Sequence, residues 1–307
     1  MRTPLLGLLL VAAAAAITPA CGGCGKKTVG DPSYAVFPKD SDILLGIDGT
    51  SFRQGQYRRL EQALPEAAAK AVASLRSCGI DPVDGVDKLV VAGSSQSRKI
   101  VARITGFTRD DFKQCAELAR ELKFTDQGGT TAFTMRGKTS HMAWLDDRTF
   151  LSGPFWKPEE LADLAASKGK ADHNSDLMSM VKRVDTNAPL WVAWAPPGGM
   201  IEIGMIGHVL GARGTLSMAT GLEIKADIKF ASYDEARSAK KLADAALPTF
   251  KEDAGDLAEF LFKIETEVDD DLVRVHINLD PQETARLISG VEHNPTVRST
   301  LREIMPF

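Results

Sequence analysis

The sequence predicts an α+β fold made of two related units, each with an antiparallel sheet and helices on one face, in the split-βαβ (ferredoxin-like) order. Short apolar segments separated by Gly, Pro and Asp indicate strands and hairpins. Apolar residues at helical spacing indicate amphipathic helices between those strands. The order of elements in residues 39–168 recurs in residues 187–292, which indicates an internal duplication.

The first 20 residues have the pattern of a secretory signal peptide. Arg2 supplies a positive charge, and Leu5 to Ile17 form an apolar run of 13 residues. As a helix this run would extend about 20 Å, which is shorter than the roughly 30 Å hydrocarbon core of a bilayer. The sequence therefore predicts a cleaved signal and not a membrane span.

A cysteine stands at the expected cleavage point. Thr18, Pro19 and Ala20 lead directly to Cys21, and this stretch resembles the lipobox of bacterial lipoproteins, although Thr18 stands where Leu is usual. The resemblance implies acyl chains such as palmitate on Cys21, and Gly22 in the next position implies the periplasmic face of the outer membrane. The alternative is cleavage by ordinary signal peptidase, which also accepts small residues and would release a soluble protein.

Residues 21–38 are rich in Gly, Lys, Pro and Ser and predict a flexible tether. The first unit, residues 39–168, begins with a strand bounded by Pro38 and Gly49. Thr108 followed by Asp111 has the pattern of a capping box and predicts the start of an amphipathic helix. The expected strands are 42–48, 88–92, 99–105, 131–135, 141–145 and 149–152, and the expected helices are 52–64, 65–78, 108–123 and 158–166.

A helical connector, residues 169–186, precedes the second unit at 187–292, and residues 293–307 are expected to form a C-terminal helix. Ser232 and Glu235 repeat the capping pattern of the first unit at an offset of 124 residues. The expected strands are 190–194, 215–219, 224–230, 264–268 and 272–279. Because few identities are shared, agreement between two common α+β patterns is the alternative to duplication.

The four cysteines fall into two kinds. Cys78 and Cys115 lie on apolar helix faces, and in an oxidising compartment they form either a disulfide or two buried thiols. Cys21 and Cys24 form a C-x-x-C, but a structural zinc site needs four ligands and no strand-helix context of a redox pair surrounds them. We therefore expect no metal and no cofactor.

The second unit contains an apolar segment where the first unit is polar. The apolar residues are Met200, Ile201, Ile203, Met205, Ile206 and Leu210. Such a segment is either core shared by the two units, which we favour, or an exposed apolar surface for a lipid, a lipid-modified partner or another subunit. Glycines within and after the segment would help it to bend.

Motifs that indicate chemistry are incomplete. Gly137-Lys138-Thr139 lacks the upstream glycine of a phosphate-binding loop. The acidic clusters 146–147 and 269–271 are typical of hairpin turns, and the five histidines show no metal-ligand spacing. The mature chain has 36 basic and 41 acidic residues, a net charge of −5, which argues against nucleic acid as a partner.

These observations predict a membrane-anchored envelope lipoprotein that acts as a non-catalytic binding or scaffolding module. Its expected partners are membrane lipid, through the acylated N-terminus, and an envelope protein or an apolar ligand. The alternative is a carrier or chaperone for an apolar ligand or lipidated partner that uses residues 200–210. A hydrolase with a dispersed site is the third hypothesis.

Overall fold

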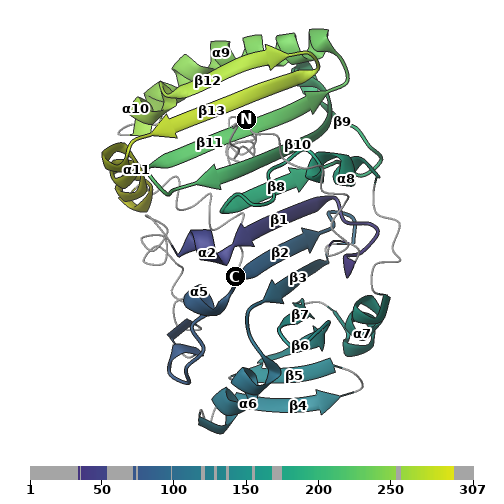
Figure 1. Ribbon diagram of the computed structural model, residues 1–307. Helices are drawn as coiled ribbons and strands as arrows, with labels where there is room; N and C mark the ends of the chain where they lie inside the picture. The colour runs from purple at the N-terminus through teal and green to yellow at the C-terminus, as the bar shows by residue number, and fades with distance from the viewer. Residues whose placement is uncertain are drawn as a thin grey trace.

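The strands of the computed structural model form one 13-stranded antiparallel sheet (Figure 1). The residues expected to form the signal peptide and the lipobox, residues 21–33 of the expected tether and the expected C-terminal helix after residue 293 lie outside the described residues. Tyr34, Val36 and Phe37, at the end of the expected tether of residues 21–38, are buried in the core, so that part of the expectation is wrong. The structure describes residues 34, 36–53, 72–73, 75–97, 99–118, 122–127, 130–135, 138–153, 156–167, 175–253 and 257–293.

The first half of the chain contributes seven strands and the second half six. The strands are β1 (Ile43–Asp48), β2 (Lys88–Gly93), β3 (Ile100–Thr105), β4 (Leu122–Gln127), β5 (Thr130–Met135), β6 (Lys138–Trp144), β7 (Thr149–Ser152), β8 (Leu190–Trp194), β9 (Ile201–Ile203), β10 (Gly207–Ser217), β11 (Leu222–Phe230), β12 (Ile264–Asp269) and β13 (Leu272–Leu279). The helices are α2 (Gly49–Phe52), α5 (Pro82–Gly85), α6 (Arg109–Leu118), α7 (Pro158–Ser167), α8 (Ser175–Val181), the 3-10 helix η2 (Gly204–Ile206), α9 (Tyr233–Asp253), α10 (Ala258–Leu261) and α11 (Pro281–His293).

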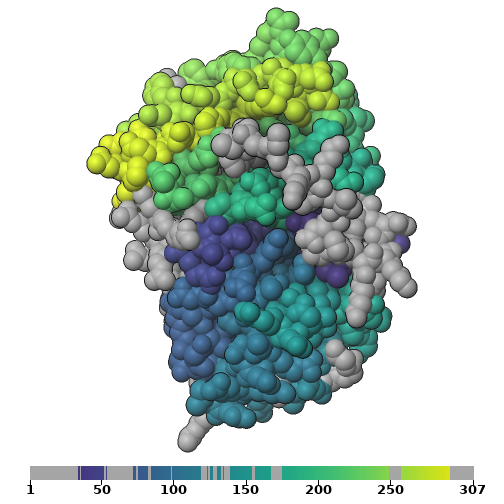
Figure 2. Space-filling view, viewed as in Figure 1, coloured from purple at the N-terminus to yellow at the C-terminus, as the bar shows by residue number. Residues whose placement is uncertain are grey.

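The two halves are joined where β1 pairs with β8, in the middle of the sheet. The strand order is β12-β13-β11-β10-β8-β1-β2-β3-β7-β6-β5-β4, and β9 pairs with β10. Outward from this seam, one half runs β1-β2-β3-β7-β6 and the other β8-β10-β11-β13-β12, so the same succession of strands occurs twice. In the space-filling view the two halves meet across the middle of the molecule (Figure 2).

The expected α+β class with antiparallel strands is confirmed, whereas the split-βαβ order is not. Every strand pair in the described part of the chain is antiparallel. In the ferredoxin-like order the first two strands of a unit are parallel and have another strand between them, whereas β1 and β2, and likewise β8 and β10, are direct antiparallel neighbours. The repeated strand order is consistent with a duplication, which stays a prediction.

The helices cover both faces of the sheet, so the expectation of helices on one face is wrong. Trp191 packs in one core cluster with residues of α7 and α8, while Trp194 packs against a second cluster with residues of α9. Successive side chains of a strand point to opposite faces, and these two residues are three apart. In Figure 1, α9 lies behind the strands of the second half. A sheet with buried side chains on both faces needs helices on both.

Two capping contacts expected from the sequence are confirmed. Thr108 Oγ1 accepts the N–H of Asp111 at 3.2 Å, and the Asp111 carboxylate accepts the N–H of Thr108 at 2.6 Å. Ser232 Oγ accepts the N–H of Glu235 at 3.3 Å. The helix expected over 108–123 ends at Leu118, however, because residues 122–127 form β4 and pair along their length with β5.

The seam depends on a glycine beneath a buried tryptophan. Trp191 is fully buried and lies directly opposite Gly46 in the β1–β8 register. A Cβ atom on Gly46 would lie 2.0 Å from the indole nitrogen of Trp191. The ring of Tyr34 packs edge-on against the same indole, with centroids 5.8 Å apart. The absence of a side chain at residue 46 therefore makes room for the largest buried side chain at the seam.

We expect Gly46→Ala to lower the free energy of unfolding by about 2–3 kcal/mol, because the added methyl group overpacks the indole. Urea denaturation measures the change. In a Trp191→Leu background the same substitution should cost much less, since the smaller side chain leaves space. An equal cost in both backgrounds would show that the glycine acts in some other way.

Candidate functional site: an apolar flap

The candidate site is a bent segment at the end of β8, residues 200–206, which we call the flap. It comprises β9 and η2. The flap turns back so that Ile203 pairs with Gly207 and Ile201 pairs with Val209 of β10. Gly198 and Gly199, which lead into it, have φ angles of +82° and +81°, a region that other residues rarely adopt.

The flap exposes some of its apolar side chains and buries others. Met200, Ile201 and Met205 are 51%, 43% and 84% exposed. Ile203 and Ile206 pack instead against the core cluster beneath α9. Of the six apolar residues that the sequence singled out, the last, Leu210, is half-buried in β10 and lies outside the flap. The segment thus forms a partly exposed edge of the second half, whereas β1 and β8 make the contact between the halves.

An ion pair joins His208, two residues after the flap, to α9. His208 Nδ1 lies 2.7 Å from Oε1 of Glu235, and the backbone N–H of His208 donates to Oε2 of the same carboxylate at 3.3 Å. The hydrogen bond to Glu235 raises the pKa of His208, and the same hydrogen bond lowers the pKa of Glu235. Sequence analysis missed this pair, because the two residues are 27 positions apart and only the fold brings them together.

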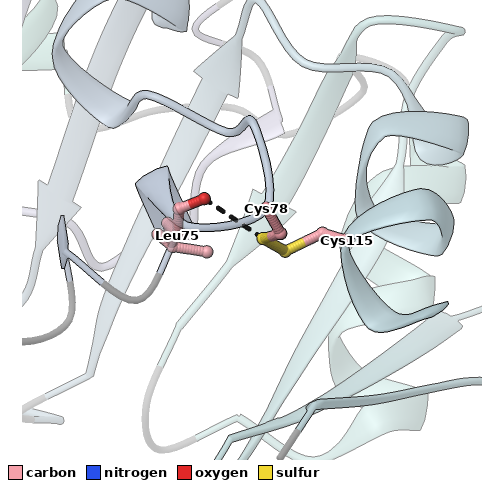
Figure 3. Close-up of a disulfide and its surroundings, with 3 residues drawn as sticks. All are labelled: Leu75, Cys78 and Cys115. Carbon is pink, nitrogen blue, oxygen red and sulfur yellow. Dashed lines mark hydrogen bonds between the residues drawn. A yellow bond between two sulfur atoms is a disulfide. The ribbon is translucent and has the colours of Figure 1, made fainter. Parts of the chain in front are cut away.

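The structure contains a disulfide between Cys78 and Cys115, one of the two alternatives left open by the sequence (Figure 3). Their Cα atoms are 4.8 Å apart, and both residues are buried. The carbonyl oxygen of Leu75 lies 3.1 Å from Sγ of Cys78. The bridge fixes the segment before α5 to α6, next to an aromatic cluster of Phe107, Phe112, Trp144 and Phe150.

The acidic cluster 269–271 lies at the hairpin between β12 and β13, in agreement with a turn. Asp270 has a φ of +55°, which Asp tolerates better than most residues. Asp269 and Asp271 bind Arg274 at 2.5 Å and Lys229 at 3.4 Å. Among the described residues, no group of three or more His, Cys, Asp and Glu side chains is arranged to hold a metal ion.

The outermost strand of the second half, β12, carries an alternating row of acidic side chains. Glu265, Glu267 and Asp269 are exposed, and the residues between them are half-buried. Arg274 and His276 on the neighbouring β13 lie within 4 Å of these carboxylates. This face of the sheet edge is therefore polar and negatively charged at its margin.

No helix within the described ranges is both long enough and apolar enough to cross a membrane.

No family model matches the sequence, and no curated protein matches it. Among solved structures, the chain is similar to TP0453 in its crystal form III, with a TM-score of 0.52 and 10% identity over 86% of this chain and 99% of that chain. Crystal form I of TP0453 gives a TM-score of 0.49 at 11% identity, over 87% and 98% of the two chains. At this level of identity the likeness to form III shows a shared fold.

We expect removal of the Cys78–Cys115 disulfide to lower the free energy of unfolding by about 4 kcal/mol, because the bridge closes a loop of 37 residues in the unfolded chain. Denaturation of the oxidised protein, the reduced protein and the Cys78→Ala/Cys115→Ala variant measures it. The reduced wild type and the variant should agree with each other. If neither differs from the oxidised protein, the bridge does not contribute to stability.

Proposed function

We propose that the chain is a lipid-anchored protein of the bacterial cell envelope whose α+β domain is a non-catalytic binding module. Acyl chains on Cys21 hold it on the periplasmic face of the outer membrane. The signal-like apolar run and the lipobox-like residues before Cys21 support the anchor. Several acyl chains on one cysteine bind a membrane stably, whereas a single chain binds only marginally.

The observation that carries the binding role is the exposure of three large apolar side chains within six residues of the flap. Single exposed apolar residues are normal on a protein surface. Met200, Ile201 and Met205 instead share one bent segment at the end of a strand, and two of the three are methionines, whose flexible side chains adapt to differently shaped apolar partners. The flap is therefore the surface that contacts an apolar ligand or the lipid of a modified partner.

A carrier and a scaffold differ in what the flap holds. A carrier binds a free apolar molecule, whereas a scaffold binds another envelope protein through the same residues. The exposed methionines support an apolar contact but do not distinguish a free ligand from a protein partner. We propose the flap as the binding site for either one. We do not propose the hydrolase, because no observation on the described residues carries it.

We expect Cys21→Ser to abolish lipid modification and membrane association of the mature protein. Intact mass and partitioning between membrane and soluble fractions measure both. Cys24→Ser is the matched control, because Cys24 lies three residues further along the same tether and should leave both properties unchanged. A wild-type protein that begins at residue 21 without added mass would contradict the anchor.

We expect Met205→Asp to weaken binding of an uncharged apolar dye by about tenfold, because it removes an apolar side chain that the ligand covers. The melting temperature should not change, since Met205 is 84% exposed. Fluorescence titration with Nile red measures the affinity.

Two further substitutions show whether a loss of dye binding is specific to the flap and distinct from a loss of stability. Leu118→Asp, at an exposed apolar residue on α6, is the matched control and should leave dye binding unchanged. Ile206→Asp should lower the melting temperature, because Ile206 packs against the core. Equal dye binding by wild type and Met205→Asp would contradict the proposed site.

A further inference from the structure

The flap is bounded by backbone that can rotate. Gly198 and Gly199 precede it, and Gly204 and Gly207 lie within it and directly after it, with φ angles of +43° and +104°. A Cβ atom at Gly198 or Gly204 would meet nothing within 4 Å. Glycine backbone costs little to move between such conformations. The hinges of the flap therefore have the residues that a local opening needs.

Two kinds of contact hold the flap in place. Ile203 and Ile206 pack against the core cluster that contains Trp194. Beyond them, the imidazole of His208 and the carboxylate of Glu235 join the start of β10 to the first turn of α9. The side chain of Glu235 also packs against Gly207. A Cβ atom on Gly207 would lie 3.1 Å from Cγ of Glu235. The ion pair thus sits at the point where the flap meets the rest of the fold.

Two carboxylates lie near the imidazole of His208. Glu235 reaches it from α9, and Glu202 stands directly opposite His208 in the β9–β10 register. The hydrogen bond to Glu235, and the charges of Glu235 and Glu202, raise the pKa of His208. Both carboxylates stabilise the imidazolium form relative to the neutral imidazole.

We propose that the His208–Glu235 pair is a pH-sensitive latch: it holds the start of β10, directly after the flap, on α9 when His208 is protonated, and it lets the flap open when His208 is neutral. Opening adds Ile203 and Ile206 to the apolar surface that the flap already exposes. This inference rests on the proposed function of the flap and adds its regulation.

The direction of the pH effect follows from the two carboxylate contacts. Because the pKa of His208 is raised in the folded state, the stabilisation is complete below the ordinary value of about 6.5 and is lost as the pH rises through the raised value. The lowered pKa of Glu235 keeps its charge in place down to acidic pH. The latch is therefore closed at mildly acidic pH and opens toward alkaline pH.

Exposure of the pair to solvent limits how much the loss of the His208 charge changes the open population of the flap. The side chains of His208 and Glu235 are 39% and 27% exposed, and neutral imidazole can still donate one hydrogen bond to the carboxylate. Loss of the charge alone should raise the open population about two- to fivefold, the range found for exposed ion pairs.

A second histidine provides a matched control. His276 on β13 also lies between two carboxylates, those of Glu223 and Glu265, each 3.6 Å from a ring nitrogen. It faces away from the flap, on the charged face of the sheet formed by β11, β12 and β13. Replacement of His276 therefore removes an imidazole that lies between two carboxylates without changing the contact between His208 and Glu235.

The test uses the full mature chain with Cys21→Ser, so that no detergent is needed, and two readouts between pH 6 and pH 8.5. Amide hydrogen exchange of residues 201–208, corrected for the intrinsic pH dependence of exchange, reports opening. Nile red binding reports the apolar surface. We expect both to rise about two- to fivefold with pH in the wild type and in His276→Gln. Both should be independent of pH in His208→Gln.

Glu235→Gln is the second variant and should also be independent of pH, with exchange as fast as in the alkaline wild type. A pH-independent wild type, or a pH dependence that persists in His208→Gln and Glu235→Gln, would overturn the latch. If dye binding depends on Met205 but not on pH, the latch fails and the proposed binding site stands. If exchange follows pH as expected but dye binding ignores Met205, the latch stands and the proposed binding site fails.

Discussion

The pairing of β1 with β8 is the interaction on which the rest of the structure depends. It joins two halves of the chain, each with its own strands and helices, into one sheet. Backbone hydrogen bonds alone would not select this register, because any two free edges can pair. Burial of Trp191 over Gly46 does select it, since a shift by one residue would turn the indole to the other face of the sheet.

The flap follows from the unequal lengths of the strands beside this seam. β10 has 11 residues and β8 has five, and β8 covers only Ala212 to Leu216 of its neighbour. The start of β10, Gly207 to Val209, would otherwise be left as an unpaired edge, and β9 turns back to pair with it. Within the flap, Ile203 and Ile206 lie next to the core beneath α9, whereas Met200, Ile201 and Met205 are exposed to solvent.

Sequence reasoning located most of the strands but not their arrangement. Residues 42–48 and 190–194 alternate or are wholly apolar between turn residues, and each is a strand in the structure. The prediction that a helix reaches residue 123 was wrong because β4 pairs with β5. That pairing depends on tertiary contacts, which the local periodicity of the sequence does not show. The distribution of helices over two faces and the contact between His208 and Glu235 depend on register, which a single sequence does not specify. The apolar helix faces around Cys78 and Cys115, in contrast, identified both residues of the disulfide but did not decide between a disulfide and two buried thiols.

The acidic margin of β12 affects how molecules of this protein contact one another at high concentration. The two halves of the sheet join through paired strands, and β12, at one end of the sheet, is a further edge strand. Such an edge has backbone groups that another strand could pair with. Two copies that approached each other there would bring Glu265, Glu267 and Asp269 of one molecule against the same carboxylates of the next. Like charges on an edge strand oppose such pairing, a device by which natural sheets avoid growing into fibres. Pairing between strand edges therefore joins the two halves within one molecule, while the acidic side chains of β12 oppose the same kind of pairing between molecules.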